Sequence, residues 1–290
     1  MQHDLECYPC LLRQALEASR MATSDEAIHR TVLREVAALL SELCPGTTPI
    51  EVGSRIHQAV RQHADSPDPY RQVKLDSNRR ALALYPRLRK YLESSESRLE
   101  TAVVIAAVGN VIDFGAHPHF DVESALENGL RSGLTGSDFH SFARRLGEVG
   151  QVLYVGDNAG EIVFDKVLVE EMASRGVRVT FAVREAPILN DATLEDALAV
   201  GMDEVAEVVS SGIVGPGTVL AQGSWHFQRL FSRSRLTLAK GQGNYEGLSQ
   251  ETGSLFFLLM AKCPVVARDL GVEVGDLVLR RPVQQAAKHL

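Results

Sequence analysis

The sequence has few cysteines, no long apolar run and no recognisable leader at its first residues. Four cysteines in a chain of 290 residues are too few to form a disulfide framework. The apolar stretch at residues 255–261 is far shorter than the roughly 20 residues that a membrane-spanning helix needs. The opening segment, residues 1–6, lacks the basic and apolar regions of a signal peptide. We therefore expect a cytoplasmic protein with no membrane-spanning segment.

An excess of basic charge is also missing. The formal net charge is −7, whereas a nucleic-acid-binding surface shows a basic stripe or patch. This balance argues against a nucleic-acid partner, but it leaves room for a local basic pocket that binds a phosphate. The remaining composition, 45% hydrophobic and 23% charged, is typical of a globular protein. At 290 residues the chain has the length of one large or two ordinary domains, and its oligomeric state stays open.

The first half of the chain is predicted to be helical. Apolar residues recur at helical spacing in four segments, which breaks rich in proline, glycine and polar residues separate. The four segments are residues 10–21, 26–43, 51–63 and 70–92. An unbroken apolar run at residues 101–108 fits a buried strand or a buried helix, and its alanine content favours a helix. Two shorter helices are expected at residues 122–131 and 137–146.

From about residue 151 the pattern changes to an alternation of strands and helices. Apolar segments of strand length recur at residues 152–155, 177–183, 205–209, 236–239 and 277–279. Helical stretches lie between several of them, which is the pattern of a mainly parallel sheet with helices on its faces. The sequence therefore predicts an α/β protein in which a helical N-terminal half packs on an α/β C-terminal half.

One strand-to-helix turn places two polar residues at the carboxyl end of a predicted strand. The apolar segment at residues 152–155 ends at Gly156, Asp157 and Asn158 follow, and a helical pattern begins at Glu161. Ligands of open α/β sheets bind outside the carboxyl ends of the strands. The side chains of Asp157 and Asn158 offer oxygen atoms, which suit hard divalent cations. The alternative is that one of them merely caps the following helix.

A third oxygen donor follows the next predicted strand. Asp191 comes after residues 177–183, so that it would reach the same edge of the sheet. Together with Asp157 and Asn158 it can supply three ligands to one Mg²⁺- or Mn²⁺-like ion, with the other positions open for water and substrate. Asp191 can instead be an ordinary helix N-cap, because a helical stretch follows it.

A lysine followed by glycines ends another predicted strand. Lys240 and Gly241 come directly after residues 236–239, and Gly243 follows two positions later. A lysine side chain and backbone N–H groups exposed by glycine can hold an anionic group. A metal ion beside such an anion site is the equipment of phosphoryl chemistry. The alternative for Lys240 is a solvated lysine at the end of a strand.

Other polar clusters give weaker indications. Asn110 and Asp113 lie in an apolar context, where a carboxylate is seldom left unpaired. His117 and His119 flank a proline, and a loop role is favoured there over metal binding. No complete dinucleotide fingerprint and no P-loop pattern occur, which argues against a Rossmann cofactor and a P-loop nucleotide.

Cys7 and Cys10 form a Cys-x-x-Cys pair, a spacing that can ligate zinc or carry out redox chemistry. No second such pair and no suitably spaced histidine pair follow, and the chain before the motif is too short for the strand that precedes a thioredoxin-like site. We therefore favour a non-catalytic pair beside the first helix, while a metal or redox role stays open.

Seven ordered motifs resemble those of one known family. They are Cys7-Tyr-Pro-Cys10-Leu-Leu, Asp68-Pro-Tyr70 with Lys74 and Asn78, Gly109-Asn-Val-Ile-Asp113-Phe-Gly, Gly156-Asp-Asn-Ala-Gly-Glu161, Leu189-Asn-Asp191-Ala-Thr, Lys240-Gly-Gln-Gly-Asn244-Tyr-Glu246 and Ala261-Lys-Cys-Pro-Val265. Over nearly its whole length the chain resembles the metal-dependent damage-control phosphatases, long filed as a domain of unknown function. The likeness is to their cysteine-bearing branch, which is widespread in archaea and bacteria. A relative is fused to some pantothenate kinases.

The resemblance implies a helical N-terminal domain, residues 1–148, packed on a three-layer α/β/α domain, residues 149–290, with a mainly parallel sheet. It implies a phosphomonoesterase that uses a divalent metal, Mn²⁺, Ni²⁺ or Co²⁺ and less often Mg²⁺. The family's metal-binding and catalytic positions fall on Asp157, Asn158 and Asp191. Its substrate- or phosphate-binding positions fall on Glu161, Lys240, Gly241, Asn244 and Lys262, and Asn110 and Asp113 are expected to line or support the pocket.

The leading hypothesis is therefore a metal-dependent phosphatase that hydrolyses phosphomonoesters of small metabolites, such as sugar phosphates and damaged or surplus phosphometabolites. The competing hypotheses are a non-catalytic metal- or phosphometabolite-binding sensor and a zinc or redox protein built around Cys7 and Cys10. Eukaryotic relatives carry Arg-Thr-x-Lys where this chain has Leu259-Met-Ala-Lys262, so their substrate preferences do not transfer. The attacking group can be water or an aspartate, and we favour water.

Overall fold

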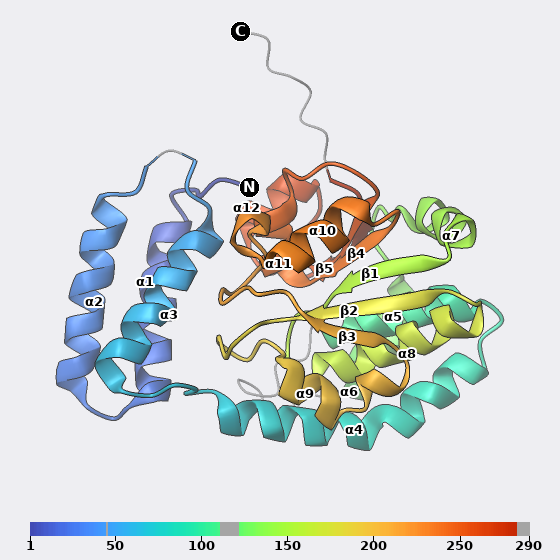
Figure 1. The fold of residues 1–290 in the computed structure, drawn as a ribbon, viewed down its shortest axis with the longest axis horizontal. Coiled ribbons are helices and arrows are strands. Elements are labelled where there is room, and N and C mark those ends of the chain that lie inside the picture. The colour runs from blue at the N-terminus through green and yellow to red at the C-terminus, as the bar shows by residue number, and fades with distance from the viewer. Residues whose placement is uncertain (45, 111–121, 283–290) are drawn as a thin grey trace, which may run out of the picture.

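The computed structural model describes residues 1–44, 46–110 and 122–282, and Figure 1 shows its course. Asp113, His117 and His119, which the sequence analysis singled out, lie outside the described residues. Within the described ranges, no helix is both long enough and apolar enough to cross a bilayer. The expected cytoplasmic location stays a prediction.

An N-terminal bundle contains the first three helices. They are α1 (Cys7–Ala22), α2 (Glu26–Ser41) and α3 (Pro49–Ala64). Local capping fixes where two of them begin. The Asp25 side chain accepts a hydrogen bond from Ala27 N–H, and Thr48 forms a capping box with Glu51 at the start of α3. The three helices predicted in this region are confirmed, with ends that differ by a few residues.

In the described part of the chain, four further helices precede the sheet. They are α4 (Arg71–Glu93), α5 (Arg98–Gly109), α6 (Val122–Ser132) and α7 (Phe139–Glu148). The ambiguous run at residues 101–108 is helical and lies inside α5. A helix that is apolar on every side must be buried on every side, and α5 packs on α6, α8 and β5. Periodicity could not identify this helix because it has no polar face.

Among the residues that the structure describes, the sheet contains six strands in the order β3-β2-β1-β4-β5-β6. They are β1 (Gln151–Val155), β2 (Arg178–Val183), β3 (Glu207–Ser210), β4 (Thr237–Lys240), β5 (Leu255–Met260) and β6 (Leu277–Arg280). Neighbouring strands are parallel except for β6, which is antiparallel to β5. The predicted α/β class with a mainly parallel sheet is confirmed. Strand β5 was not among the strands predicted from the sequence, because a short apolar run without alternation fits a buried helix equally well.

Helices cover both faces of the sheet and so form three layers (Figure 1). The helices of the second half are α8 (Glu161–Ser174), α9 (Leu194–Ala199), α10 (Trp225–Arg233), α11 (Gly241–Leu248) and α12 (Pro264–Leu270). One core, shared with α4, α5 and α8, takes Val152 and Tyr154 of β1. The other core, shared with α10, α11 and α12, takes Leu153 and Val155. Successive side chains of a strand point to opposite faces, so β1 contributes to both cores.

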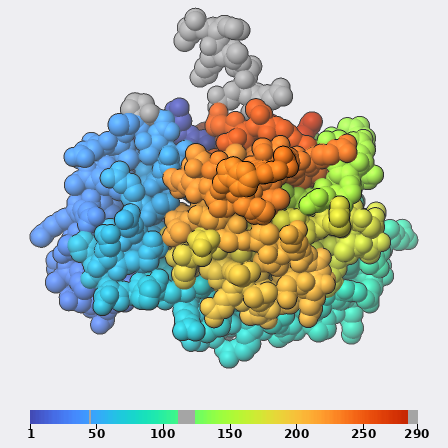
Figure 2. Space-filling model, in the orientation of Figure 1, coloured from blue at the N-terminus to red at the C-terminus, as the bar shows by residue number. Residues whose placement is uncertain are grey.

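The N-terminal bundle lies beside the edge of the sheet at which the parallel strands end (Figure 1). Helix α3 contacts α11 there, and in Figure 2 the bundle packs directly against the body of the molecule. Helices α4 to α7 share the core of the α/β part although they precede residue 149. The division of the chain at residues 148 and 149 stays a prediction.

Candidate active site

Two polar loops meet at the carboxyl edge of the sheet. Backbone hydrogen bonding between β1 and β2 continues for one residue beyond the end of β1. Residues 157–159 then follow as a loop. This segment pairs antiparallel with residues 190–192 through two backbone hydrogen bonds of 2.8 Å. The pairing places Asp157 and Asn158 beside Asp191, although the two loops are distant in the sequence.

Arg184 lies between the two aspartates and was not identified from the sequence. Its Nε donates to Asp191 Oδ2 (2.7 Å), and its Nη2 lies 3.9 Å from Asp157 Oδ1. Nη1 and Nη2 also donate to Thr218 Oγ1 and Asn244 Oδ1, both at 2.9 Å. A planar guanidinium with five N–H donors can hold several acceptors in fixed positions. One feature of the sequence could have identified Arg184. It directly follows a predicted strand, as do the other polar residues that were selected for this reason.

A second charged network lies in the interior beside the first. Lys240 is fully buried, and its Nζ forms ion pairs with Glu161 and, at 2.8 Å, with Asp165. Tyr154 donates to Asp165 Oδ1 (2.8 Å). Glu161 is the first residue of α8, where a helix N-terminus favours negative charge. Lys240 was predicted to bind phosphate, and in the structure these two carboxylates surround its ammonium group.

Asn110, at the end of α5, joins the two networks. Its Nδ2 lies 3.1 Å from both carboxylate oxygens of Glu161 and 3.3 Å from Asp157 Oδ2. Its Oδ1 accepts a hydrogen bond from the backbone N–H of Met260 (3.0 Å). Asn158 Nδ2 bridges the same pair of carboxylates, at 3.1 Å from each. The two amides thus fix Asp157 relative to Glu161.

Asn244 and Gly241 hold the start of α11 against the aspartate loop. Asn244 Nδ2 donates to the backbone oxygens of Gly156 (3.0 Å) and Lys240 (2.7 Å). Its Oδ1 accepts the hydrogen bond from Arg184 Nη2 described above. Gly241 has a φ of +79°, and a Cβ atom there would lie 1.8 Å from Asp157 Oδ2. The Asp157 carboxylate therefore occupies the space that any other residue at position 241 would fill.

The carboxylates of the site destabilise one another's charge. Burial raises the pKa of Asp157 well above its ordinary value, and the charges of Glu161 and Asp191 raise it further. Burial also raises the pKa of Asp191, against the opposing effect of Arg184. For Glu161 burial acts in the same direction, but Lys240 and Lys262 outweigh it and its pKa lies below the ordinary value. More negative charge is buried here than the neighbouring cations balance.

This charge excess fits a divalent cation. Two carboxylates and the amide oxygen of Asn158 form a hard oxygen donor set of the kind that Mg²⁺ and Mn²⁺ accept. Within the part of the chain that the structure describes, no cluster of three or more carboxylate, imidazole or thiol groups is arranged to hold a metal ion. The candidate set of Asp157, Asn158 and Asp191 contains only two such groups, because its third member is an amide.

A cavity of about 620 Å³ opens at the site, between the strand ends and the N-terminal bundle. Asp157, Asn158 and Asp191 line one side of it, and residues of α1 and α3 line the other. Lys262 also lines the cavity, and its side chain is exposed. Of the two lysines expected to bind phosphate, Lys262 reaches the cavity surface, whereas the buried Lys240 is not among the lining residues.

Three of the four cysteines line the same cavity: Cys7 and Cys10 on α1, and Cys263 next to Lys262. Burial raises the pKa of the thiols of Cys7 and Cys10, and the carboxylate of Glu246 adds to the effect. Both thiols are therefore kept protonated at neutral pH, which does not favour a nucleophilic or redox role.

Helix α4 stabilises the loop that follows β1 and carries Asp157 and Asn158. Asn78 Oδ1 accepts a hydrogen bond from Gly160 N–H (2.6 Å), and its Nδ2 donates to Asp196 (3.1 Å). Lys74 forms ion pairs with Asp68 (3.0 Å) and Asp196 (3.4 Å). These contacts give a structural role to Lys74 and Asn78, which were noted in the sequence only as part of a motif that resembles the family's.

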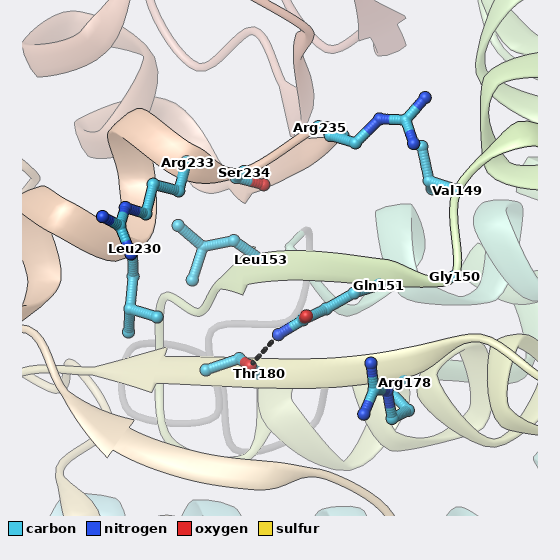
Figure 3. A pocket seen from close by; sticks show the side chains of 10 residues that line it. All are labelled: Val149, Gly150, Gln151, Leu153, Arg178, Thr180, Leu230, Arg233, Ser234 and Arg235. Atoms are coloured by element: carbon cyan, nitrogen blue, oxygen red, sulfur yellow. Dashed lines mark hydrogen bonds between the residues drawn. The ribbon is translucent and has the colours of Figure 1, made fainter.

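A second cavity, of about 370 Å³, lies at the opposite end of β1 and β2 (Figure 3). Arg178, Arg233 and Arg235 lie around it, and none of the predicted site residues lines it. Because ligands of open α/β sheets bind at the carboxyl ends of the strands, the candidate active site is the cavity at those strand ends.

The fold and the site together define an α/β protein with a carboxylate-rich ligand cleft at the carboxyl edge of its sheet. The family model for the damage-control phosphatase ARMT1-like domain matches residues 3–278. The chain belongs to this damage-control phosphatase family, as the resemblance implied.

Individual relatives agree with this assignment. The chain is 35% identical to a damage-control phosphatase of Archaeoglobus fulgidus in an alignment of 286 positions, which covers 94% of this chain and 97% of that one. Identity to a damage-control phosphatase of Pyrococcus horikoshii is also 35%, over 97% of this chain and 98% of that one. The crystal structure of a DUF89 family protein from Pyrococcus horikoshii superposes with a TM-score of 0.89 at 34% identity, covering 98% of this chain and 100% of the other.

We predict that Gly241→Ala disrupts the site, because the new Cβ would displace the Asp157 carboxylate. The matched control is Gly176→Ala, where φ is +78° but no atom lies within 4 Å of the added Cβ. The control should lose only about 1 kcal/mol for the left-handed backbone, whereas Gly241→Ala should lose about 3 kcal/mol or more. Chemical denaturation measures both. Equal losses in the two variants would show that the close approach of residue 241 to Asp157 is unimportant.

We also predict that a Cys7→Ser, Cys10→Ser double variant keeps its turnover and its metal content. Both thiols are held protonated, and within the described residues no hydrogen bond joins either of them to the aspartates. Steady-state kinetics and metal analysis, with the exposed Cys44→Ser as control, check this. A folded double variant without turnover would place the pair in the mechanism.

Proposed function

We propose that the protein is a divalent-metal-dependent phosphomonoesterase that hydrolyses phosphate esters of small metabolites. The observation that carries the proposal is the arrangement of Asp157, Asn158 and Asp191 at the carboxyl edge of the sheet, facing a cavity into which Lys262 also reaches. Mn²⁺, Ni²⁺, Co²⁺ and Mg²⁺ are the candidate ions. When bound, such an ion supplies a Lewis acid that polarises a phosphoryl oxygen.

The residues of the chain hold the substrate and the metal ligands. Lys262 has an exposed ammonium group beside the aspartates and binds the phosphate by charge. Helices α8 and α11 both begin at the site, so that their N-terminal N–H groups favour an anion there. Lys240 acts indirectly, because it positions Glu161 from the interior. Arg184 performs the same task for the two aspartates.

Water is the attacking group in this proposal. Both aspartates are already engaged by Arg184, and Asp157 is also held by two amides. A carboxylate fixed in this way is suited to hold a cation and poorly suited to move toward phosphorus. A cavity of about 620 Å³ has room for a sugar phosphate or another metabolite of that size.

Removing the charge of Asp157 should abolish metal binding but raise the stability of the metal-free protein. Asp157→Asn keeps the shape of the side chain but removes a buried charge whose ionised form the fold disfavours, as its raised pKa shows. We expect the metal-free variant to melt at a higher temperature than metal-free wild type at neutral pH. Added Mn²⁺ should raise the melting temperature of wild type and not that of the variant, which should be inactive.

The control for this experiment is Asp203→Asn, which removes an exposed carboxylate. It should leave the metal-induced stabilisation and the turnover unchanged. Retention of both in Asp157→Asn would remove Asp157 from the proposed metal site.

Lys262→Ala should weaken phosphate recognition without weakening metal binding. The loss of one donor to the transition state lowers kcat/KM by about 10²- to 10³-fold. Inhibition by free phosphate should disappear, while the stabilisation by Mn²⁺ stays as in wild type. The control is Lys90→Ala, an exposed lysine in the last turn of α4. Normal kcat/KM in Lys262→Ala would remove this residue from the anion site.

A further inference from the structure

Glu246 lies in the catalytic cleft but takes no part in the charge networks described above. It is on α11, one turn after Gln242, and it lines the cavity. Its Oε1 accepts a hydrogen bond from Gln242 Nε2 (2.8 Å), and Gln242 Oε1 accepts one from the backbone N–H of Lys262 (2.8 Å). One glutamine therefore links this carboxyl group to the segment that carries the phosphate-binding lysine of the proposed function.

The second oxygen of the carboxyl group is available to a ligand. Among the described residues no hydrogen bond reaches Glu246 Oε2, and this atom is not sealed from solvent. Since the side chain lines the cavity, Oε2 can contact a molecule bound there.

A phosphatase that acts on alkyl phosphates benefits from an acid beside the leaving oxygen. When the bond between phosphorus and the ester oxygen breaks, an alkyl leaving group departs as an unstable alkoxide unless it receives a proton. Among the described residues, six side chains along the cavity wall, outside the charge networks, carry a carboxyl or thiol group: Glu6, Glu17, Glu246, Cys7, Cys10 and Cys263.

Most of these groups are poor proton donors. Glu6 and Glu17 are exposed to solvent, unlike the enclosed side chain of Glu246. The pKa of the thiols of Cys7 and Cys10 is raised by burial, so these thiols retain their protons.

Glu246 has surroundings of a different kind. Burial raises its pKa to about 7, against the opposing effects of the Gln242 hydrogen bond and the amino group of Met1. The titratable and charged groups around it are the Met1 amino group, the thiols of Cys7, Cys10 and Cys263, and Lys262 across the same cavity. A carboxyl group with such a pKa is partly protonated at neutral pH and can transfer its proton.

We propose that Glu246 is the general acid that protonates the leaving oxygen of alkyl phosphate substrates. The proposal rests on the proposed function. Water attacks phosphorus, the bond between phosphorus and the ester oxygen breaks, and its electron pair stays on that oxygen. The oxygen takes the proton of the Glu246 carboxyl group and leaves as an alcohol. The proton released by the attacking water passes to solvent, and the Glu246 carboxylate regains a proton from solvent.

The test compares two substrates in Glu246→Gln, which preserves the Gln242 contact geometry but has no acidic proton. Glycerol phosphate needs protonation of its leaving oxygen, whereas p-nitrophenyl phosphate releases a stable phenolate without it. We expect kcat/KM for glycerol phosphate to fall by about 10²-fold or more, the scale of lost general-acid catalysis. The value for p-nitrophenyl phosphate should stay within about threefold of wild type.

The pH profile supplies a second readout that does not depend on the variant. In wild type, kcat/KM for glycerol phosphate should fall as the pH rises through about 7, because the acid loses its proton. The profile for p-nitrophenyl phosphate should lack this alkaline decrease. Glu17→Gln, which changes an exposed carboxyl group of the same cleft, should keep the wild-type kcat/KM and the wild-type pH profile for both substrates.

Several outcomes would overturn the proposal. Equal losses for both substrates in a folded Glu246→Gln would mean that the residue only supports the site, and no loss for either would remove it from the reaction. If the variant does not fold, identical wild-type pH profiles for the two substrates would also overturn the proposal. Wild-type protein that hydrolyses neither substrate with Mn²⁺, Ni²⁺ or Co²⁺ would instead overturn the proposed function itself.

Discussion

The burial of several carboxylates at one edge of the sheet is the constraint on which the rest of the site depends. A buried carboxylate is costly unless cations and hydrogen-bond donors surround it. Arg184 and Lys240 supply the positive charge that the carboxylates require. Each lies at the end of a buried strand, so that its side chain reaches the site from the interior. The amide of Asn110 and the glycine at position 241 complete the arrangement, one as a donor and the other by leaving space.

The cations of the site divide into two groups with different tasks. The buried ones hold carboxylates in place and are enclosed by them, whereas Lys262 keeps its ammonium group at the cavity surface. The incomplete charge balance leaves the protein less stable than it could be, which is a common property of sites that await a ligand. A bound cation would remove part of that cost, so ligand binding and stability are coupled at this edge.

The sequence alone predicted the class of fold and the edge of the sheet at which the candidate site residues gather, because residues after parallel strands must meet at one edge. It did not separate the side chains that line the cavity, such as Asp157 and Lys262, from those that are directed into the interior. Lys240 and Asn244 stand in a motif associated with substrate binding, yet both side chains are directed into the interior. Arg184 was missed because its partners come from other loops, and such contacts between distant segments leave no local pattern. The same reason explains why the cavity wall formed by α1, with Cys7 and Cys10, was not connected with the site.

The cleft has two walls from separate parts of the chain, and this has an evolutionary consequence. The wall at the strand ends carries the charge networks, in which almost every substitution would disturb several partners at once. The opposite wall belongs to α1 and α3, whose cleft residues include Gln14, Ile50 and Gly53. Substitutions on that surface can change the shape offered to the part of a substrate beyond its phosphate. Descendants of one ancestral protein can therefore diverge in the compounds they accept while the reacting edge stays the same.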